Sequence, residues 1–202
     1  MPAADSPYHH GDLRRALLDA GLGLLKEGGP DAVTMREVAR RAGVSHAAPY
    51  HHFADKAALI EAMAVLGFEK LTVALERAAS TKGLDALEQF RRTSRAYARF
   101  ALNHHELFRL MNRPEMRQDA SIVEATRTAY AVIERAVVRC QEAGIIAPGP
   151  SEPYALTAWA AVHGGVILAL DGLYTGTVMS ARKTEALVHT ITEVLGSGLM
   201  AR

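Results

Sequence analysis

A cluster of hydrogen-bond donors lies between residues 34 and 56. Its members carry hydroxyl, guanidinium, phenol, imidazole or ammonium groups, at expected helix starts or on a short helical segment: Thr34, Arg36, Tyr50, His51 and Lys56. Side chains of these kinds bind the phosphate oxygens of nucleic acids. Helix N-termini expected near Met35, His46 and Lys56 would add backbone N–H groups and favourable dipole ends. The pattern therefore predicts contact with a phosphate backbone.

Small or short side chains precede Tyr50, and they are suited to reading base edges. They are His46, Ala47, Ala48 and Pro49. Such residues let a helix backbone approach the bases, where Ala47 or Ala48 can contact a thymine methyl group and His46 can donate to guanine. We therefore expect this segment to begin the reading helix.

Two short helices and a turn are expected to position these groups. Residues 34–37 (Thr-Met-Arg-Glu) form a capping box, in which the threonine hydroxyl caps the helix and Glu37 reaches back. Gly43 suits a turn that needs positive φ. Ser45 then caps a second helix that runs to about Phe53. This is the spacing of a helix-turn-helix, whose second helix enters the major groove. Two packed helices without a ligand are the alternative interpretation.

Helical periodicity continues through the rest of the chain. Leu13, Leu17, Ala20 and Leu24 share one face of an opening helix that ends at residues 28–30. Asp55 caps a long helix over 56–79 with Leu59, Met63, Leu66 and Val73 on its apolar side, and helices follow at about 84–103, 105–112, 115–142, 152–174 and 180–199. We predict an all-α fold of about nine helices. It comprises a three-helix head (1–56), a linking helix (55–79) and a C-terminal bundle (80–202).

The run from Tyr8 to about Leu66 resembles the DNA-binding domain of the TetR (TetR/AcrR) repressor family. The matching pieces are the opening helix, TMREVARRAGVS, four variable residues, YHHF and DKAAL. The resemblance implies a bacterial, homodimeric repressor that a small molecule releases from a palindromic operator. It implies phosphate contacts from Thr34, Tyr50 and Lys56, and base or phosphate contacts from Arg36 and positions 45–51, Ser45 included. The chain differs from many members at Pro49, where leucine is common.

The C-terminal region is similar to the ligand and dimer domain of the same family. The segment 159–165 (Trp-Ala-Ala-Val-His-Gly-Gly) resembles the tryptophan–histidine–glycine helix of one subgroup. An aromatic-lined cavity suits a mostly apolar ligand of unknown identity. We expect it to be lined by Tyr97, Phe100, His104, Phe108, Met111, Tyr130, Trp159 and His163. Core packing without a ligand is the other interpretation of these residues.

The last two helices are expected to form the dimer interface. Residues 154–170 are apolar on nearly every face, which predicts burial all round. The helix after them has a broad apolar stripe that includes Leu187, Ile191 and Leu195. Two such helices per subunit can pair about a twofold axis.

Composition and missing motifs limit the other function classes. The 23 Lys and Arg nearly balance the 22 Asp and Glu, so a basic surface must be local. The single cysteine, Cys140, excludes an internal disulfide and fits a reducing cytoplasm. We expect no signal sequence, no membrane partner, no metal and no cofactor. An enzyme is disfavoured because no nucleophile elbow, phosphate loop or zinc-protease motif occurs. An interaction module that has lost DNA binding is the remaining alternative.

Overall fold

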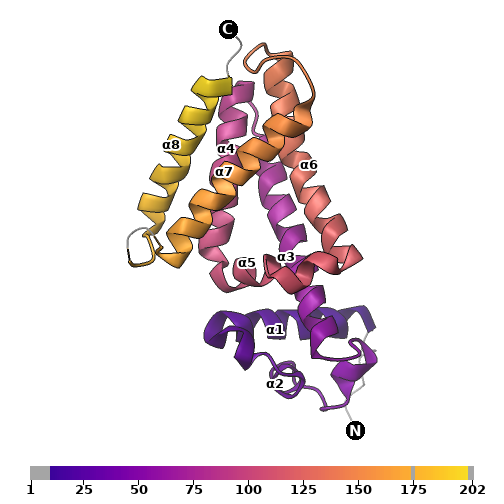
Figure 1. Cartoon of the computed structure of the whole chain (residues 1–202). Helices are drawn as coiled ribbons and strands as arrows, with labels where there is room; N and C mark the ends of the chain where they lie inside the picture. Colours follow the sequence, from indigo (N-terminus) through magenta and orange to yellow (C-terminus); the bar gives the residue numbers. More distant parts are fainter. Residues whose placement is uncertain (1–9, 174–175, 200–202) are drawn as a thin grey trace.

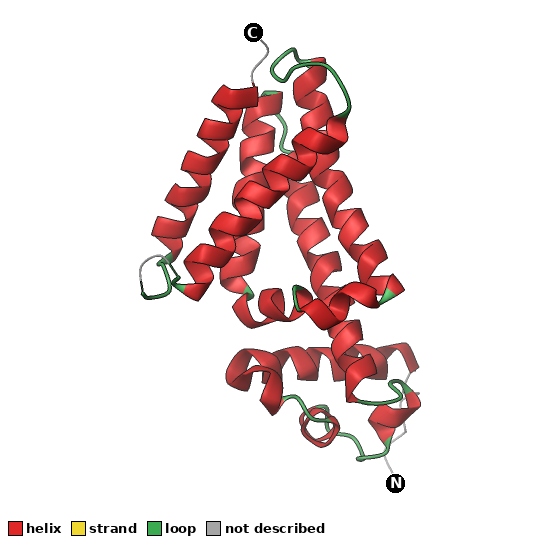
Figure 2. Cartoon of the chain, viewed as in Figure 1, coloured by secondary structure: helices red, strands yellow, loops and turns green. Residues whose placement is uncertain are grey.

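The all-α prediction is confirmed by a computed structural model, which describes residues 10–173 and 176–199 (Figures 1 and 2). The α-helices are α1 (His10–Ala32), α2 (Met35–Arg41), α3 (Lys56–Ala79), α4 (Ala86–Asn103), α5 (His105–Met111), α6 (Ala120–Glu142), α7 (Ser151–Asp171) and α8 (Ala181–Leu199). Two 3-10 helices, η1 (Ala48–His51) and η2 (Pro114–Gln118), complete the described elements.

The helices form a small head and a larger body, and α3 runs from one into the other (Figure 1). The head contains α1, α2, η1 and the start of α3. Helices α4, α6, α7 and α8 form the body around the second half of α3, and α7 packs on α4, α6 and α8. The short helix α5 lies at the base of the body and packs against α1. Two helices, α3 and α5, therefore connect the head with the body.

The opening helix buries the predicted face and is broken at the predicted glycines. Leu17, Ala20 and Leu24 are buried. Gly29 leaves the helical conformation with φ 69°, a region that glycine adopts without steric cost, and Pro30 begins a further short turn. The chain can therefore reverse direction toward α2 while the apolar face of α1 stays in the core of the head.

Helix α3 changes its buried face along its length, which the sequence did not predict. Leu59 and Met63 are fully buried as expected. Val73, predicted on the same stripe, is 50% exposed, whereas Leu71 and Leu75 are buried. The buried residues do not follow a single apolar stripe, because α3 packs on the head at its start and on α4 and α6 farther along.

The predicted helix over 115–142 is two elements. Residues 114–118 form the 3-10 helix η2, and α6 begins only at Ala120. The break is set by Asp119, whose carboxylate accepts hydrogen bonds from the backbone N–H of Ser121 at 2.9 Å and of Ile122 at 3.0 Å. Aspartate at this position stabilises a helix start. Farther along α6, Cys140 is buried, and burial raises the pKa of its thiol to about 11.

The prediction that residues 154–170 are buried all round is wrong for the single chain. Helix α7 is long and apolar enough to cross a membrane by length and composition. Its inner side, which includes Ala155, Val162 and Val166, packs in the core of the body. Its outer side leaves Leu156 53% and Leu168 46% exposed. An apolar helix with one packed side and one open apolar strip is typical of a subunit that associates with another.

Candidate DNA-binding head and ligand pocket

Helix α2 is the first helix of the predicted helix-turn-helix, and the segment after it forms the turn. The Thr34 hydroxyl accepts a hydrogen bond from the backbone N–H of Glu37 at 3.1 Å, as the capping box requires. The Glu37 carboxylate pairs with Arg40 at 2.8 Å, where the sequence predicted a contact to the helix start. Gly43 has φ 71°, so it supplies the positive φ of the turn. The chain then turns back over α2.

The reading segment is a 3-10 helix over Ala48–His51, whereas the sequence predicts a longer helix that Ser45 caps and that runs to about Phe53. Backbone N–H groups of Ala48 and Tyr50 donate to the carbonyls three residues earlier, at 3.1 Å each. Pro49 accounts for part of this difference, because it has no N–H to donate to the Ser45 carbonyl four residues earlier. The segment Ala48–His51 is accordingly short, and Ser45 does not cap it.

The structure exposes most of the residues predicted to contact DNA. Exposed side chains are those of Thr34, Arg36, Ser45, His46, Ala47, Tyr50, His51 and Lys56. Tyr50 is 57% exposed although its side chain is aromatic. Ala48 is half-buried. Pro49 is buried, so its predicted contact with a base is corrected: its ring packs inward.

The first turn of α3 places Lys56 beside the head. The Asp55 carboxylate accepts from the backbone N–H of Ala58 at 2.9 Å, which confirms the predicted cap. The Lys56 ammonium donates to the carbonyl of Pro30 at 3.4 Å. This long contact uses one of three ammonium protons, and the others remain for an anion.

Two contacts that sequence reasoning missed stabilise the head. The Arg41 guanidinium forms two hydrogen bonds of 2.5 Å with the Glu27 carboxylate, which joins α2 to α1. The Arg41 hydrogen bond lowers the pKa of Glu27. Gly23 makes room for this pair, because a Cβ there would lie 2.9 Å from the guanidinium. In addition, the Arg14 guanidinium lies 5.3 Å from the centre of the Phe53 ring.

In the body, a hydrogen-bonded aromatic cluster joins α4 to α7. The Tyr97 hydroxyl is 2.7 Å from Nδ1 of His163, and the Trp159 indole donates to the same hydroxyl at 3.4 Å. Burial raises the pKa of Tyr97, and the bond from Trp159 opposes this rise. The phenol is therefore neutral and is shared by two partners from α7.

Further aromatic contacts extend this cluster to α5 and α6. The Phe108 ring packs edge-on against Tyr97 at 5.7 Å, and Tyr130 lies 5.4 Å from Trp159. The Tyr130 hydroxyl donates to the carbonyl of Glu152 at 3.1 Å. The structure thus brings Tyr97, Phe108, Tyr130, Trp159 and His163 together, as predicted.

An open hollow of about 330 Å³ reaches the cluster from the side of α5, η2 and α6. Met111, another predicted pocket residue, lines it together with Asn112, Met116, Thr126, Trp159 and His163. Beyond Trp159, two internal hollows of about 10 Å³ each lie between Leu75, Tyr97 and Ile133. Trp159 lines all three spaces.

Two of the predicted pocket residues lie elsewhere. Phe100 is buried and packs against His104 with ring centres 4.8 Å apart. Both side chains line a separate groove between α3 and α4. His104 does not face the aromatic cluster as predicted, because α4 ends at Asn103 and the chain turns there.

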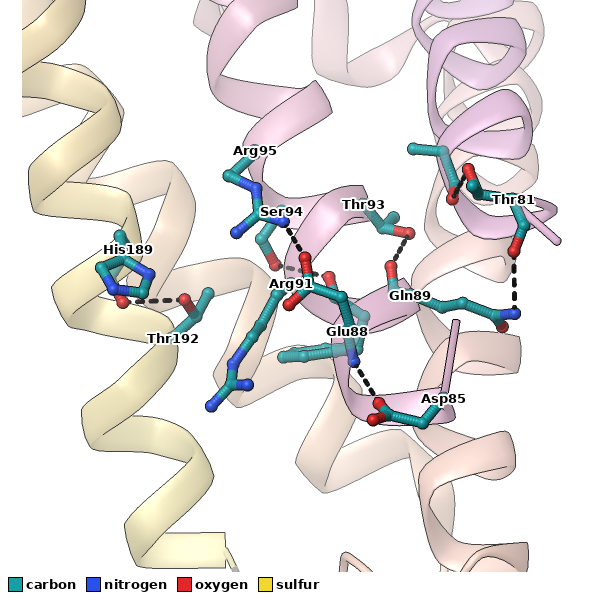
Figure 3. Close-up of polar contacts among 12 residues, drawn as sticks. Thr81, Asp85, Glu88, Gln89, Arg91, Thr93, Ser94, Arg95, His189 and Thr192 are labelled. Atoms are coloured by element: carbon teal, nitrogen blue, oxygen red, sulfur yellow. Dashed lines mark hydrogen bonds and ion pairs between the residues drawn. The ribbon is translucent and has the colours of Figure 1, made fainter. Parts of the chain in front are cut away.

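Polar contacts also hold α4 against α8, and none of them was predicted from sequence. Arg91 pairs with Glu193 at 2.7 Å, and Arg99 pairs with Glu185 at 2.7 Å. Figure 3 shows the neighbouring contacts along α4, among them the cap by Asp85 on the backbone of Glu88. These pairs fix α8 on the side of α4.

Comparison with known proteins identifies both regions. Residues 17–63 match bacterial regulatory proteins of the tetR family, and residues 90–195 match the tetracyclin repressor-like C-terminal domain. The HTH-type transcriptional regulator BetI of Rhizobium meliloti is 49% identical over 47 residues, which is 23% of this chain and 23% of BetI. The match therefore spans under a quarter of that regulator's length.

Solved structures resemble the whole chain. A protein of unknown function from Rhodococcus sp. RHA1 is 38% identical, with a TM-score of 0.81 over 98% of this chain and 100% of that one. The TetR family transcriptional regulator PfmR from Thermus thermophilus is 21% identical, with a TM-score of 0.65 over 92% of this chain and 99% of PfmR. At 21% identity, the resemblance to PfmR shows a shared fold.

Replacing Tyr97 by phenylalanine tests the hydrogen-bonded cluster. The change removes a hydroxyl that serves both His163 and Trp159, so we expect the free energy of unfolding to fall by about 1–2 kcal/mol. Urea unfolding at a fixed protein concentration measures this. The control is Tyr50→Phe, an exposed site where the change should be within about 0.5 kcal/mol. Equal unfolding curves for both variants would contradict the bonded arrangement.

Proposed function

This chain belongs to the TetR family of DNA-binding transcriptional regulators, and we propose that it is a repressor that binds a palindromic operator as a homodimer and leaves it when a small molecule occupies the body. As a member of this family it is a regulator and not an enzyme. We place its action in the cytoplasm, where operator DNA lies. The alternative of an interaction module without DNA binding loses support because the expected phosphate donors are all exposed.

The observation that carries the proposal is the exposed set Thr34, Tyr50 and Lys56. Each lies at the start of a helix or on the short reading segment, and none is needed for the core of the head. Lysine, tyrosine and threonine in such positions bind phosphate and thereby orient the reading segment. The neighbouring exposed residues 45–47 are then free to contact base edges.

The exposed strip on α7 supports the homodimer. Leu156, Ala160, Gly164 and Leu168 follow one another at intervals of four, so they share one face of the helix. A Cβ at Gly164 would meet no atom within 4 Å, so this face is open to a partner. Val194 on α8 adds to the exposed apolar surface, with 64% exposure. Pairing of α7 and α8 with their copies would bury this surface and give two reading segments about one DNA turn apart.

The cluster around Trp159 supports an effector site for a mostly apolar molecule. The open hollow that leads to it is lined largely by apolar side chains, with a few polar groups such as Asn112 and His163. Helix α5 contributes Phe108 and Met111 to this region and packs against α1 of the head. At Gly67 in α3 a Cβ would lie 2.6 Å from the Met111 sulfur, so α5 and α3 are in close contact. A ligand that displaces α5 would therefore move the head.

Lys56→Ala tests the DNA-binding proposal. We expect weaker operator binding and a salt dependence whose slope is smaller by about one, because the variant binds one phosphate fewer. Fluorescence anisotropy with the region upstream of the chain's own gene, at several salt concentrations, measures both quantities. Lys82→Ala, in the exposed turn after α3, is the control and should bind as the wild type does. If the wild-type chain bound neither the upstream region nor any sequence selected from random DNA, the proposal would be wrong.

Charges on the outer strip of α7 test the homodimer. The double variant Leu156→Glu/Leu168→Glu should be monomeric, because two carboxylates per subunit would have to be desolvated in the interface. Light scattering after size-exclusion chromatography measures the mass. Val73→Glu introduces a carboxylate at an equally exposed apolar site on α3 and should leave a dimer. A double variant that stays dimeric would place the interface elsewhere.

The only tryptophan of the chain reports on the effector site. A small apolar compound that enters the cluster should change the fluorescence of Trp159 and, at the same concentrations, weaken operator binding about 5- to 150-fold, the range of typical allosteric coupling. A panel of apolar compounds can be screened by fluorescence and then by anisotropy. Compounds that change the fluorescence without any effect on operator affinity would reject the coupling.

A further inference from the structure

A groove of about 540 Å³ lies between α3 and α4, apart from both the DNA-binding head and the aromatic cluster. Its lining is Ala74, Arg77 and Ala78 of α3 with Arg92, Arg95, Ala96, Arg99, Phe100 and Asn103 of α4, together with His104. The three alanines leave the space between the helices open. Four of the ten lining residues are arginines, and none is acidic.

Two of these arginines have partners outside the groove, and two have none among the described ion pairs. Arg95 pairs with Glu88 along α4, as Figure 3 shows, and Arg99 pairs with Glu185 of α8. No ion pair is found for Arg77 or Arg92 within residues 10–173 and 176–199. Both of their side chains are exposed. The groove therefore has more positive charge than its neighbours neutralise.

The positions along α4 explain why the charges meet. Arg92, Ala96, Arg99 and Asn103 follow at intervals of four, three and four residues, which places them along one face of the helix. Arg77 lies in the last turn of α3 and faces the same groove. Guanidinium and amide donors from two helices thus converge on one space.

The electrostatic surroundings of His104 agree with this charge. Its pKa is lowered first by burial and then by the positive charges of Lys70 and Lys26. The ring packs on Phe100, which lines the same groove. Positive charge thus extends from the arginines to the corner between α4 and α5.

We propose that the groove binds a small multivalent phosphate, of the class of diphosphates. Planar guanidinium groups donate two parallel hydrogen bonds to phosphate oxygens, and an anion would neutralise Arg77 and Arg92, whereas Arg95 and Arg99 already pair with carboxylates. Phosphates of the operator do not reach this site. Arg77 is 21 residues beyond Lys56 on the same straight helix, which is about 30 Å at the rise of an α-helix. This site goes beyond the proposed function and does not depend on it.

Titration calorimetry with inorganic pyrophosphate on the full-length chain, without DNA and at low salt, tests the proposal. We expect saturable binding of one pyrophosphate per chain. The variant Arg77→Gln/Arg92→Gln should bind at least tenfold more weakly. Its control is Arg113→Gln/Arg182→Gln, which removes the same charge from two other exposed arginines and should change the affinity less than twofold. Thermal unfolding monitored by circular dichroism checks that both variants are folded.

Four results would overturn the proposal. The first is the absence of saturable binding to the wild-type chain. The second is an equal loss of affinity in both double variants, which would mean that pyrophosphate responds to net charge alone. The third is a loss of pyrophosphate binding in Lys56→Ala, which would place the anion on the DNA-binding head. A folded Arg77→Gln/Arg92→Gln variant with unchanged affinity would exclude the groove directly.

Discussion

Helix α3 has to pack against the helices of the head and those of the body at once, and the arrangement of the molecule depends on this constraint. Leu59 and Met63 are buried at its start, and Leu71 and Leu75 are buried farther along. Because 24 residues form one continuous helix, the two buried faces are fixed relative to each other by the helix geometry alone. The orientation of the head is then set by the helix and by the contact of α1 with α5. This contact is the second link between the halves of the molecule.

The two candidate functional regions use polar groups in opposite ways. In the head, the donors remain exposed and most have no role in the core, which suits a surface that binds phosphate. In the body, the hydroxyl of Tyr97 is buried and bonded to two partners from α7. Burying such a group is favourable only when it is hydrogen-bonded, so any molecule that separates Tyr97 from His163 has to replace that bond. An effector that binds there as proposed would therefore need an apolar body and one polar group.

Local signals in the sequence predicted most of the fold. Thr34 and Asp55 cap their helices as expected, and Gly43 forms the turn with positive φ. Such features depend on a few neighbouring residues, so spacing alone reveals them. Asp119 likewise caps the start of α6, but the helical pattern continues across residues 115–142, so this break was not predicted from the sequence.

Contacts between distant residues could not be predicted in this way. Arg41 and Glu27 are 14 positions apart, and Arg99 and Glu185 are 86 apart, so only the folded chain brings them together. The aromatic set was predicted by type, yet Phe100 and His104 face a different space from Tyr97. Side chains three positions apart on an α-helix, such as Tyr97 and Phe100, differ in direction by about 60°, which is enough to give them different neighbours in a bundle. Residue types indicated a pocket, but which of the predicted residues line it depends on how α4 packs.

The 3-10 conformation of Ala48–His51 has a consequence for the length of DNA that the reading segment can cover. A 3-10 helix rises about 2.0 Å per residue, so four residues span about 8 Å, compared with about 6 Å in an α-helix. Stacked base pairs in B-form DNA are about 3.4 Å apart, so the segment extends over roughly two base-pair steps. Side chains three apart, such as Ala47 and Tyr50, also lie one above the other in this geometry. If the chain binds a palindromic operator as proposed, each half of that operator would be read over very few base pairs.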